Sequence, residues 1–330
     1  MVSLSPGSAG RPKSDYAPSE IDDLTDEEIE DLIGCSAQKY PERIAFGDHH
    51  ITRVTDTIVS KFGQDVEEDV AEPSEALTLD LVFRHTTIPV PRVRRIIRDP
   101  IGITLILMDY IPGRQLSVVW PTMSLEERLC VVFTLRDYVR QLQAVRHPRS
   151  AVPGPVAPGD EARTCESPVW GQLIERRGPF TSYRDFSIWC DRAQRVGIDL
   201  LKKKPRWTTS DLRFEPFDTI MGSSPFVLCH QDLNMRNIIV GDDGRLWLVD
   251  WAWAGFYPPW FEYISMKEQS ENEESVMHRK EPFWDLMIPF ICRPYYREER
   301  WLQKVMPAFL YKFERDSRNL AEDYRTCTTG

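Results

Sequence analysis

Four polar residues within the segment 228–250 have types and a spacing that could carry out phosphoryl transfer. The segment contains His230, Asp232 and Asn237 in the pattern H-x-D-x-x-x-x-N, and Asp250 ends an apolar run thirteen residues after Asn237. One aspartate can take or orient the proton of an acceptor hydroxyl, while an asparagine and a second aspartate can hold Mg²⁺ against nucleotide phosphates. The block therefore predicts a site that transfers phosphate from a nucleotide.

The elements around these residues must bring them together. Three strand-like runs flank the block, at 226–229, 238–240 and 246–249. Between the last two, a Gly-Asp-Asp-Gly turn at 241–244 predicts a hairpin that returns the chain so that Asp250 faces Asn237. An ordinary hairpin beside a chance H-x-D is the alternative, but four polar positions at fixed spacing favour the catalytic interpretation.

The composition narrows the classes of partner. The chain has 330 residues, 42% of them hydrophobic, which is enough for one large domain or two lobes that share a cleft. Its formal charge of −10 argues against a nucleic-acid partner, which would require a basic surface, and is compatible with a cationic small substrate. Much of the acidity is local, because the segment 20–31 alone holds eight carboxylates.

The seven cysteines are scattered, odd in number and without a C-x-x-C pair. This pattern is typical of reduced thiols in a cytoplasmic protein and argues against a disulfide framework or a zinc site. The N-terminus lacks the apolar core of a signal peptide, and no apolar run approaches the ~18 residues of a membrane span. The basic run 202–206 indicates either a nuclear import signal or, more simply, a solvated helix end.

We expect two segments before the main body of the protein. Residues 1–19 are rich in Ser, Pro and Gly and predict a disordered tail. Residues 20–39 predict an acidic helical extension, in which a capping box of Thr25 with Glu28 starts a short helix over 26–34. This helix either packs on the body or stays apart from it, and its apolar residues are Ile29, Leu32 and Ile33.

The remaining chain predicts an α+β, bilobal fold. Residues 40–110 form the first lobe, a small antiparallel sheet with one helix, and residues 111–330 form a larger, mainly helical lobe after the turn at Pro112-Gly113. The strands expected in the first lobe are 43–46, 50–54, 57–62, 93–97 and 103–108, with a helix from 68 or 73 to 85. In the second lobe we expect a helix that begins at the capping box Ser124–Glu127, a loop over 148–163, and helical segments near 182–201 and 274–323.

These motifs together resemble a known family. The strings HQDLNMRNIIV and VDWAWAGFYPPWFEY, preceded by IVSKFG and ILMDYIPGRQL, are similar to those of the aminoglycoside-phosphotransferase-like enzymes, which belong to the wider choline-kinase and protein-kinase-like fold. The similarity covers roughly residues 40–265 and is strongest to fungal members of this phosphotransferase family. It implies a kinase-like arrangement with the nucleotide in the cleft between the lobes.

The resemblance implies a role for each residue of the catalytic block. Asp232 would be the catalytic base, and His230 would brace the loop rather than transfer protons. Asn237 and Asp250 would be the magnesium ligands. Arg236 would offset nearby carboxylates or touch phosphate, or else form a structural ion pair.

The resemblance also implies a nucleotide site in the first lobe. Lys61, which ends an apolar-rich strand, would contact the α- and β-phosphates of ATP or GTP, unless it is a solvated strand-edge lysine. Glu75, on the following helix, would pair with Lys61. The backbone of Met108, Asp109 and Tyr110 would form the hinge that binds adenine.

Several features depart from protein kinases. A Gly-rich nucleotide loop is not visible, since the chain offers only 47–50 (Gly-Asp-His-His), and Asp250-Trp251-Ala252 replaces D-F-G, as is usual in small-molecule kinases. Asn234 occupies a position where proline is common in relatives. The aromatic residues and Glu262 after Asp250 could receive a cationic acceptor, but packing, with an ion pair for Glu262, is the preferred interpretation.

We therefore expect an enzyme that uses ATP or GTP and Mg²⁺ to phosphorylate a hydroxyl of a small molecule. A non-catalytic kinase-like protein that binds nucleotide and regulates a partner is the first alternative, and the complete set of five polar site residues argues against it. A protein kinase is the second alternative. No A-P-E segment or phosphorylatable activation loop follows Asp250 in the sequence, which argues against that class.

Overall fold

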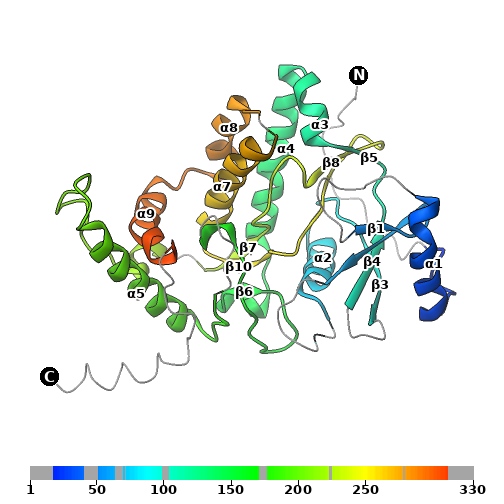
Figure 1. Ribbon diagram of the computed structural model, residues 1–330, viewed down its shortest axis with the longest axis horizontal. Coiled ribbons are helices and arrows are strands. Elements are labelled where there is room, and N and C mark those ends of the chain that lie inside the picture. Colours follow the sequence, from blue (N-terminus) through cyan, green and yellow to red (C-terminus); the bar gives the residue numbers. More distant parts are fainter. Residues whose placement is uncertain are drawn as a thin grey trace.

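The computed structural model has two lobes with mixed α and β structure, which confirms the predicted fold class (Figure 1). It describes residues 18–40, 51–63, 70, 72–98, 104–170, 177–222, 225–277 and 279–310. The expected tail and the turn at 47–50 lie almost entirely outside these ranges, as does the expected strand 43–46.

The first lobe is built on a four-stranded antiparallel sheet in the order β1-β2-β4-β3. Its strands are β1 (Ile51–Arg53), β2 (Ile58–Phe62), β3 (Val93–Arg98) and β4 (Thr104–Asp109). Helix α2 (Ser74–His85) lies between β2 and β3 in the chain, and α1 (Asp26–Lys39) precedes the sheet. The expected strands and helix of the described part are therefore present, with ends shifted by a few residues.

Both faces of this sheet are covered. Successive side chains of β4 point to opposite sides of the sheet, and each side packs against a different group of buried residues. Ile106 and Met108 join the core shared with α2, whereas Leu105 and Leu107 pack with Ile29 of α1. Helices α1 and α2 thus cover opposite faces, as Figure 1 shows.

Helix α1 is longer than expected and docks on the body. The predicted capping box is present, since the Thr25 side chain accepts from the Glu28 N–H and the Glu28 carboxylate accepts from the Thr25 N–H. The helix passes through Gly34 and ends at Lys39, just before Pro41 in the sequence. Ile29 is fully buried, while Leu32 is 37% exposed and points away from the sheet.

The second lobe contains two small antiparallel sheets that hold the central segment of the chain. One has the order β6-β10-β7, with β6 (Gly154–Pro155), β10 (Gly255–Tyr257) and β7 (Val227–Cys229). The other has the order β5-β8-β9, with β5 (Gly113–Gln115), β8 (Ile238–Gly241) and β9 (Leu246–Leu248). Gly113 has φ +152°, and a Cβ there would lie 2.4 Å from the Val240 carbonyl oxygen, so this crossing from lobe to lobe requires glycine.

Helices form the rest of the second lobe. They are α3 (Leu116–Val119), α4 (Leu125–Ala144), α5 (Tyr183–Leu201), α6 (Phe217–Met221), α7 (Trp260–Met277), α8 (Pro282–Cys292) and α9 (Tyr296–Leu310), with 3₁₀ turns at Trp120–Thr122, Pro148–Ala151 and Pro168–Trp170. The expectation of a helical segment over 274–323 was wrong in its division within the described residues, and its part from 311 to 323 lies outside them. Pro282 and Pro294 separate three helices, the first of which begins at Trp260.

The core of this lobe is aromatic. The Trp170 ring makes edge contacts with the rings of Phe186, Trp189, Phe261 and Phe309, which brings α5, α7 and α9 together. Helices α5 and α9 approach so closely that a Cβ on Gly197 would lie 2.0 Å from the Lys304 carbonyl oxygen. Most aromatic residues that follow Asp250 belong to the core, since Trp251, Tyr257 and Trp260 are at most 3% exposed, whereas Trp253 is half-buried.

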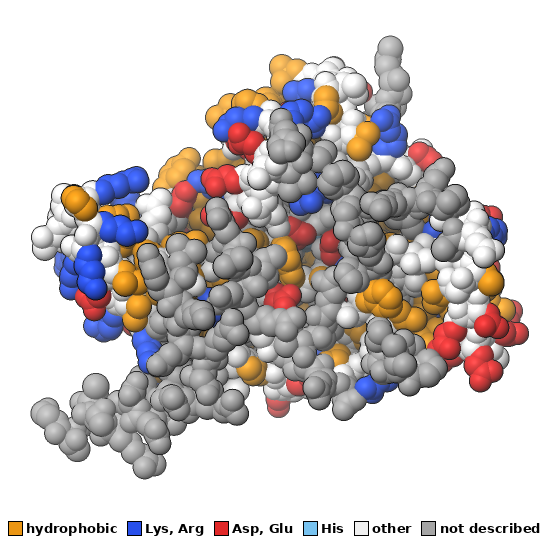
Figure 2. Space-filling view, viewed as in Figure 1, with side chains coloured by type: hydrophobic (Ala, Val, Ile, Leu, Met, Phe, Trp, Pro, Cys, Tyr) orange, Lys and Arg blue, Asp and Glu red, His pale blue; other side chains and the backbone are white. Residues whose placement is uncertain are grey.

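Charge is concentrated at the two ends of the molecule. Figure 2 shows acidic side chains over α1 and Lys and Arg side chains at the opposite end, around the C-terminus of α5. The basic run 202–206 lies there and is exposed, as expected of a solvated helix end. Within the described residues, no helix combines the length and apolar character that a membrane span requires. The six described cysteines are all free thiols.

Candidate active site

The catalytic block lies where the two small sheets of the second lobe meet. Strand β7 leads into His230 and Asp232, and β8 begins directly after Asn237. The predicted hairpin is present, because β8 pairs with β9 and the turn closes with the Gly244 N–H donating to the Gly241 carbonyl (2.9 Å). The Val249 N–H donates to the Asn237 carbonyl (3.0 Å), which brings Asp250 beside Asn237.

The carboxylate of Asp232 is surrounded by side-chain amides. Asn234 donates to Oδ1 (2.8 Å), Asn237 donates to Oδ2 (2.6 Å), and Gln269 of α7 also donates to Oδ1. Burial, with a further contribution from the nearby charge of Asp250, raises the pKa of Asp232 well above its usual range. A group with a raised pKa and a defined orientation suits a base that takes up a proton.

His230 has the contacts of a brace. Its ring Nε2 lies 3.1 Å from the Val249 carbonyl, and its Nδ1 accepts from the Asp232 N–H (3.2 Å), so the proton is on Nε2. Burial lowers the pKa of His230 to about 4, which makes the ring neutral at physiological pH. A neutral ring with both nitrogens engaged ties the two halves of the block together.

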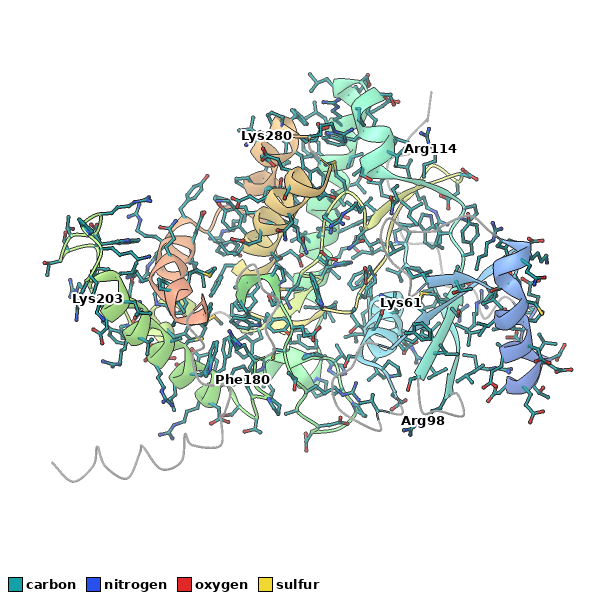
Figure 3. The ribbon with its side chains drawn as sticks, in the orientation of Figure 1. Lys61, Arg98, Arg114, Phe180, Lys203 and Lys280 are labelled. Atoms are coloured by element: carbon teal, nitrogen blue, oxygen red, sulfur yellow. The ribbon has the colours of Figure 1, made fainter. Side chains whose placement is uncertain are left out.

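Lys61 connects the two lobes (Figure 3). Its Nζ lies 2.8 Å from the Glu75 carboxylate on α2 and 2.6 Å from Asp250 Oδ1. Burial alone would lower the pKa of Lys61, but the carboxylates of Asp250 and Glu75 outweigh it and raise the pKa. The pairing of Lys61 with Glu75 is thus present, and the alternative of a solvated lysine is wrong, since Lys61 is 2% exposed.

Glu75 links this ion pair to the residue that follows Asp250. Its Oε1 accepts from the Trp251 N–H (3.1 Å) as well as from Lys61. Burial raises the pKa of Glu75, against the opposing effect of Lys61, whereas Lys61 lowers the pKa of Asp250 despite burial. The backbone of Asp250 has φ +64°, a left-handed conformation that is uncommon outside glycine.

The donor set of Asn237 and Asp250 fits Mg²⁺. Asn237 uses Nδ2 to hold Asp232, which leaves its Oδ1 as a ligand, and Asp250 is partly exposed with a second carboxylate oxygen beside the one bonded to Lys61. Mg²⁺ commonly takes one or two protein oxygens and completes its shell with phosphates and water. Among the described residues, no group of three or more His, Cys, Asp or Glu forms a self-sufficient metal site.

The predicted hinge lies at the end of β4, where the chain leaves the first lobe. Its N–H groups are already used within that lobe: Asp109 donates to the Arg92 carbonyl (3.0 Å) and Tyr110 donates to the Thr57 carbonyl (2.7 Å). Met108 lies within β4, opposite Val59 of β2. Among the described residues, none accepts from the N–H of the next residue, Ile111.

Helix α7 supplies three buried polar residues that sequence reasoning did not place at the site. Glu262 accepts from the N–H groups of His230 (2.6 Å) and Gln231 (3.1 Å), Gln269 donates to Asp232, and Glu273 pairs with Arg236 (3.3 Å). Their spacing of seven and four residues places them on one face of the helix. The expected ion pair of Glu262 was wrong, because its partners are backbone N–H groups, whereas the structural ion pair of Arg236 is confirmed.

A second unpredicted contact joins the lobes at the start of α2. Arg163, which is 2% exposed, comes from the segment expected to be an exposed loop. Its guanidinium donates to the Glu72 carbonyl (2.9 Å) and to Ser74 Oγ (2.7 Å), at the N-terminus of the helix that carries Glu75. The second lobe therefore holds the helix that positions Lys61.

Three solved structures that the chain is similar to are distant from it in sequence. One is the GDP complex of wild-type aminoglycoside 2'-phosphotransferase-IIIa, with 12% identity, a TM-score of 0.48, and coverage of 89% of this chain and 93% of that chain. Another is ADP-bound aminoglycoside phosphotransferase APH(2'')-Ib, with 13% identity, a TM-score of 0.47, and coverage of 91% and 95%. The gentamicin complex of APH(2'')-IIa has 14% identity, a TM-score of 0.44, and coverage of 89% and 97%.

No curated protein sequence matches the chain significantly. Residues 52–282 match the phosphotransferase enzyme family (APH), and this range contains every residue of the site described above. Because the match extends over more than half of the sequence, the chain belongs to the phosphotransferase enzyme family.

Proposed function

We propose that this phosphotransferase moves the γ-phosphate of ATP or GTP to a hydroxyl group of a small molecule. The observation that carries the proposal is a pair of polar clusters that meet between the two lobes. One runs from Glu75 through Lys61 to Asp250, and in the other Asn237 holds Asp232. The backbone hydrogen bond just before Asp250 brings the two clusters together. Every member is a residue type that phosphoryl transfer requires.

Each residue then has a distinct task. Lys61 would bind the nucleotide phosphates, and Glu75 holds Lys61 in place. Asn237 and Asp250 would hold Mg²⁺, which would supply positive charge against the phosphates. The backbone at the end of β4, at Ile111 and the neighbouring predicted hinge residues, receives the base.

Asp232 makes the acceptor competent. A hydroxyl is a poor nucleophile at neutral pH, and a carboxylate within hydrogen-bond reach orients it and accepts its proton as the new O–P bond forms. The brace of His230 and the amides around Asp232 keep this carboxylate in one orientation.

The test separates binding from turnover in one variant. Asp232→Asn keeps the shape but removes the charge, so Mg·ATP binding measured by calorimetry should stay near the wild-type value. Phosphate transfer to a pool of amino alcohols, sugars and aminoglycosides should fall by about 10²–10⁴-fold. Asp242→Asn, at the exposed hairpin turn, is the matched control and should keep its turnover.

Two further results decide between this proposal and the kinase-like binding protein. Lys61→Ala and Asp250→Ala should each weaken Mg·ATP binding, because each removes a charge that faces the phosphates. An Asp232→Asn variant that turns over as fast as wild type would exclude Asp232 as the base. A wild type that binds nucleotide but phosphorylates no acceptor would favour the regulatory binding protein.

A further inference from the structure

Gln269 reaches the predicted base from outside the catalytic loop. It lies on α7, is 4% exposed, and donates through Nε2 to Oδ1 of Asp232, 37 residues earlier in the chain. Its other amide atom, Oε1, accepts from Asn272 Nδ2 (3.2 Å) one helical turn later. Asn272 therefore fixes the orientation of the amide so that its donor faces Asp232.

The donors around Asp232 are unevenly divided between its two oxygens. Oδ1 accepts from both Asn234 and Gln269, whereas the Asn237 side chain is the amide on Oδ2. A carboxylate oxygen has about two good acceptor directions. The two amides fill those of Oδ1, whereas Asn237 is the one side-chain donor to Oδ2 among the described residues, so that Oδ2 keeps a second direction for an acceptor hydroxyl.

We propose that Gln269 is a positioning residue that fixes the Asp232 carboxylate so that Oδ2, rather than Oδ1, receives the acceptor hydroxyl. This inference rests on the proposed function. In the reaction the hydroxyl oxygen forms a bond to the γ-phosphorus and its proton passes to Oδ2. The bond from the γ-phosphorus to the β,γ-bridging oxygen breaks, and its electron pair leaves with ADP.

The contacts explain why a residue outside the loop is needed. Asn234 and Asn237 belong to the same short loop as Asp232 and orient the carboxylate relative to that loop. Helix α7 orients the loop relative to the rest of the lobe, because Glu262 and Glu273 of the same face hold it at His230 and Arg236. Gln269 lies between these two anchors and acts on the reacting group itself.

The experiment compares two substitutions at this position with a control on the same helix. Gln269→Met keeps the length and volume but loses the donor, and Gln269→Glu replaces the donor by a second carboxylate against Oδ1. The control is Glu271→Gln, an exposed residue of α7. The probes are Mg·ATP hydrolysis with water as acceptor and phosphate transfer to glycerol, with the melting temperature and the Kd for Mg·ATP measured in parallel.

Both Gln269 variants should lose kcat by about ten- to a hundredfold, as misplaced catalytic groups do, while Kd, the KM for glycerol and the melting temperature stay near wild type. The control should retain its kcat. Unchanged kcat in Gln269→Met, or a loss that only follows a lower melting temperature, would overturn the positioning role. A raised KM for glycerol with normal kcat would also overturn it, because Gln269 would then bind the acceptor.

Failure of the proposed function gives a different result. A wild type that binds Mg·ATP but transfers phosphate to neither water nor glycerol nor any compound of the acceptor pool overturns the proposed transfer and the positioning role together. An active wild type with unaffected Gln269 variants overturns the positioning role alone.

Discussion

Replacing Glu262 by glutamine should change how the stability of the protein depends on pH. Glu262 is 1% exposed, and burial raises its pKa from 4.5 to about 7 even though two backbone N–H groups oppose the shift. The folded chain therefore binds more protons than the unfolded chain between these pH values. The stability that the protonated carboxyl contributes is present below about pH 4.5 and is lost as the pH rises through about 7.

The size of the effect follows from that shift. Between about pH 5 and pH 8 the wild type should lose about 2–3 kcal/mol of unfolding free energy relative to Glu262→Gln, which has a similar shape and does not titrate. Glu262→Gln should carry an additional, pH-independent loss, because its amide nitrogen cannot accept from the second of the N–H groups of His230 and Gln231. The change of the difference with pH, rather than its value at one pH, therefore reports the titration of Glu262.

Denaturant unfolding followed by tryptophan fluorescence at several pH values measures this difference, since all other titrating groups are common to both proteins. Glu127→Gln is the control. The Glu127 carboxylate is exposed, and hydrogen bonds from Ser124 lower its pKa, so it stays ionised over this pH range. The difference in unfolding free energy between Glu127→Gln and wild type should therefore not change with pH. The reasoning would be refuted if the unfolding free energy of the wild type, relative to that of Glu262→Gln, stayed constant or rose with pH. Glu262 would then be ionised over the whole pH range without a loss of stability.

Two further predictions concern the contacts that hold the first lobe. Ile29→Ala should lower the free energy of unfolding by about 2–4 kcal/mol, as other buried large-to-small substitutions do. Leu32→Ala, on the exposed side of α1, is the control and should have little effect. Equal losses for the two variants in denaturant unfolding would contradict the docking of α1 through Ile29. Arg163→Leu should cost about 2 kcal/mol by removing the guanidinium that donates to Ser74 Oγ and to the Glu72 carbonyl, and should weaken Mg·ATP binding by loosening α2; calorimetry with an unchanged Kd would show that α2 does not depend on this clamp.

The sequence predicted the parts of the site that are close together along the chain. The catalytic loop, the hairpin at 241–244 and the approach of Asp250 to Asn237 depend on short-range turn and strand signals. The pairing of Lys61 with Glu75 was also correct, but it came from the resemblance rather than from local pattern.

What the sequence did not reveal depends on contacts through space. Nothing near Arg163 indicates that it reaches the start of α2. The stripe formed by Glu262, Gln269 and Glu273 was detectable in principle, because polar residues at helical spacing would face one partner, but the sequence does not show that the partner is the catalytic loop. The availability of hinge N–H groups depends on the register of the sheet, which residue types do not fix.

The position of α1 and α9 has a practical consequence for producing smaller forms of this protein. The family similarity begins at residue 52 and ends at residue 282, but the buried core extends beyond both limits. A fragment with those limits would expose the outer sheet face that Ile29 covers, and would lack Trp301 and Phe309, which complete the aromatic core. Uncovered apolar strands and a half-built core favour self-association, so fragments should begin before Ile21 and extend at least to residue 310.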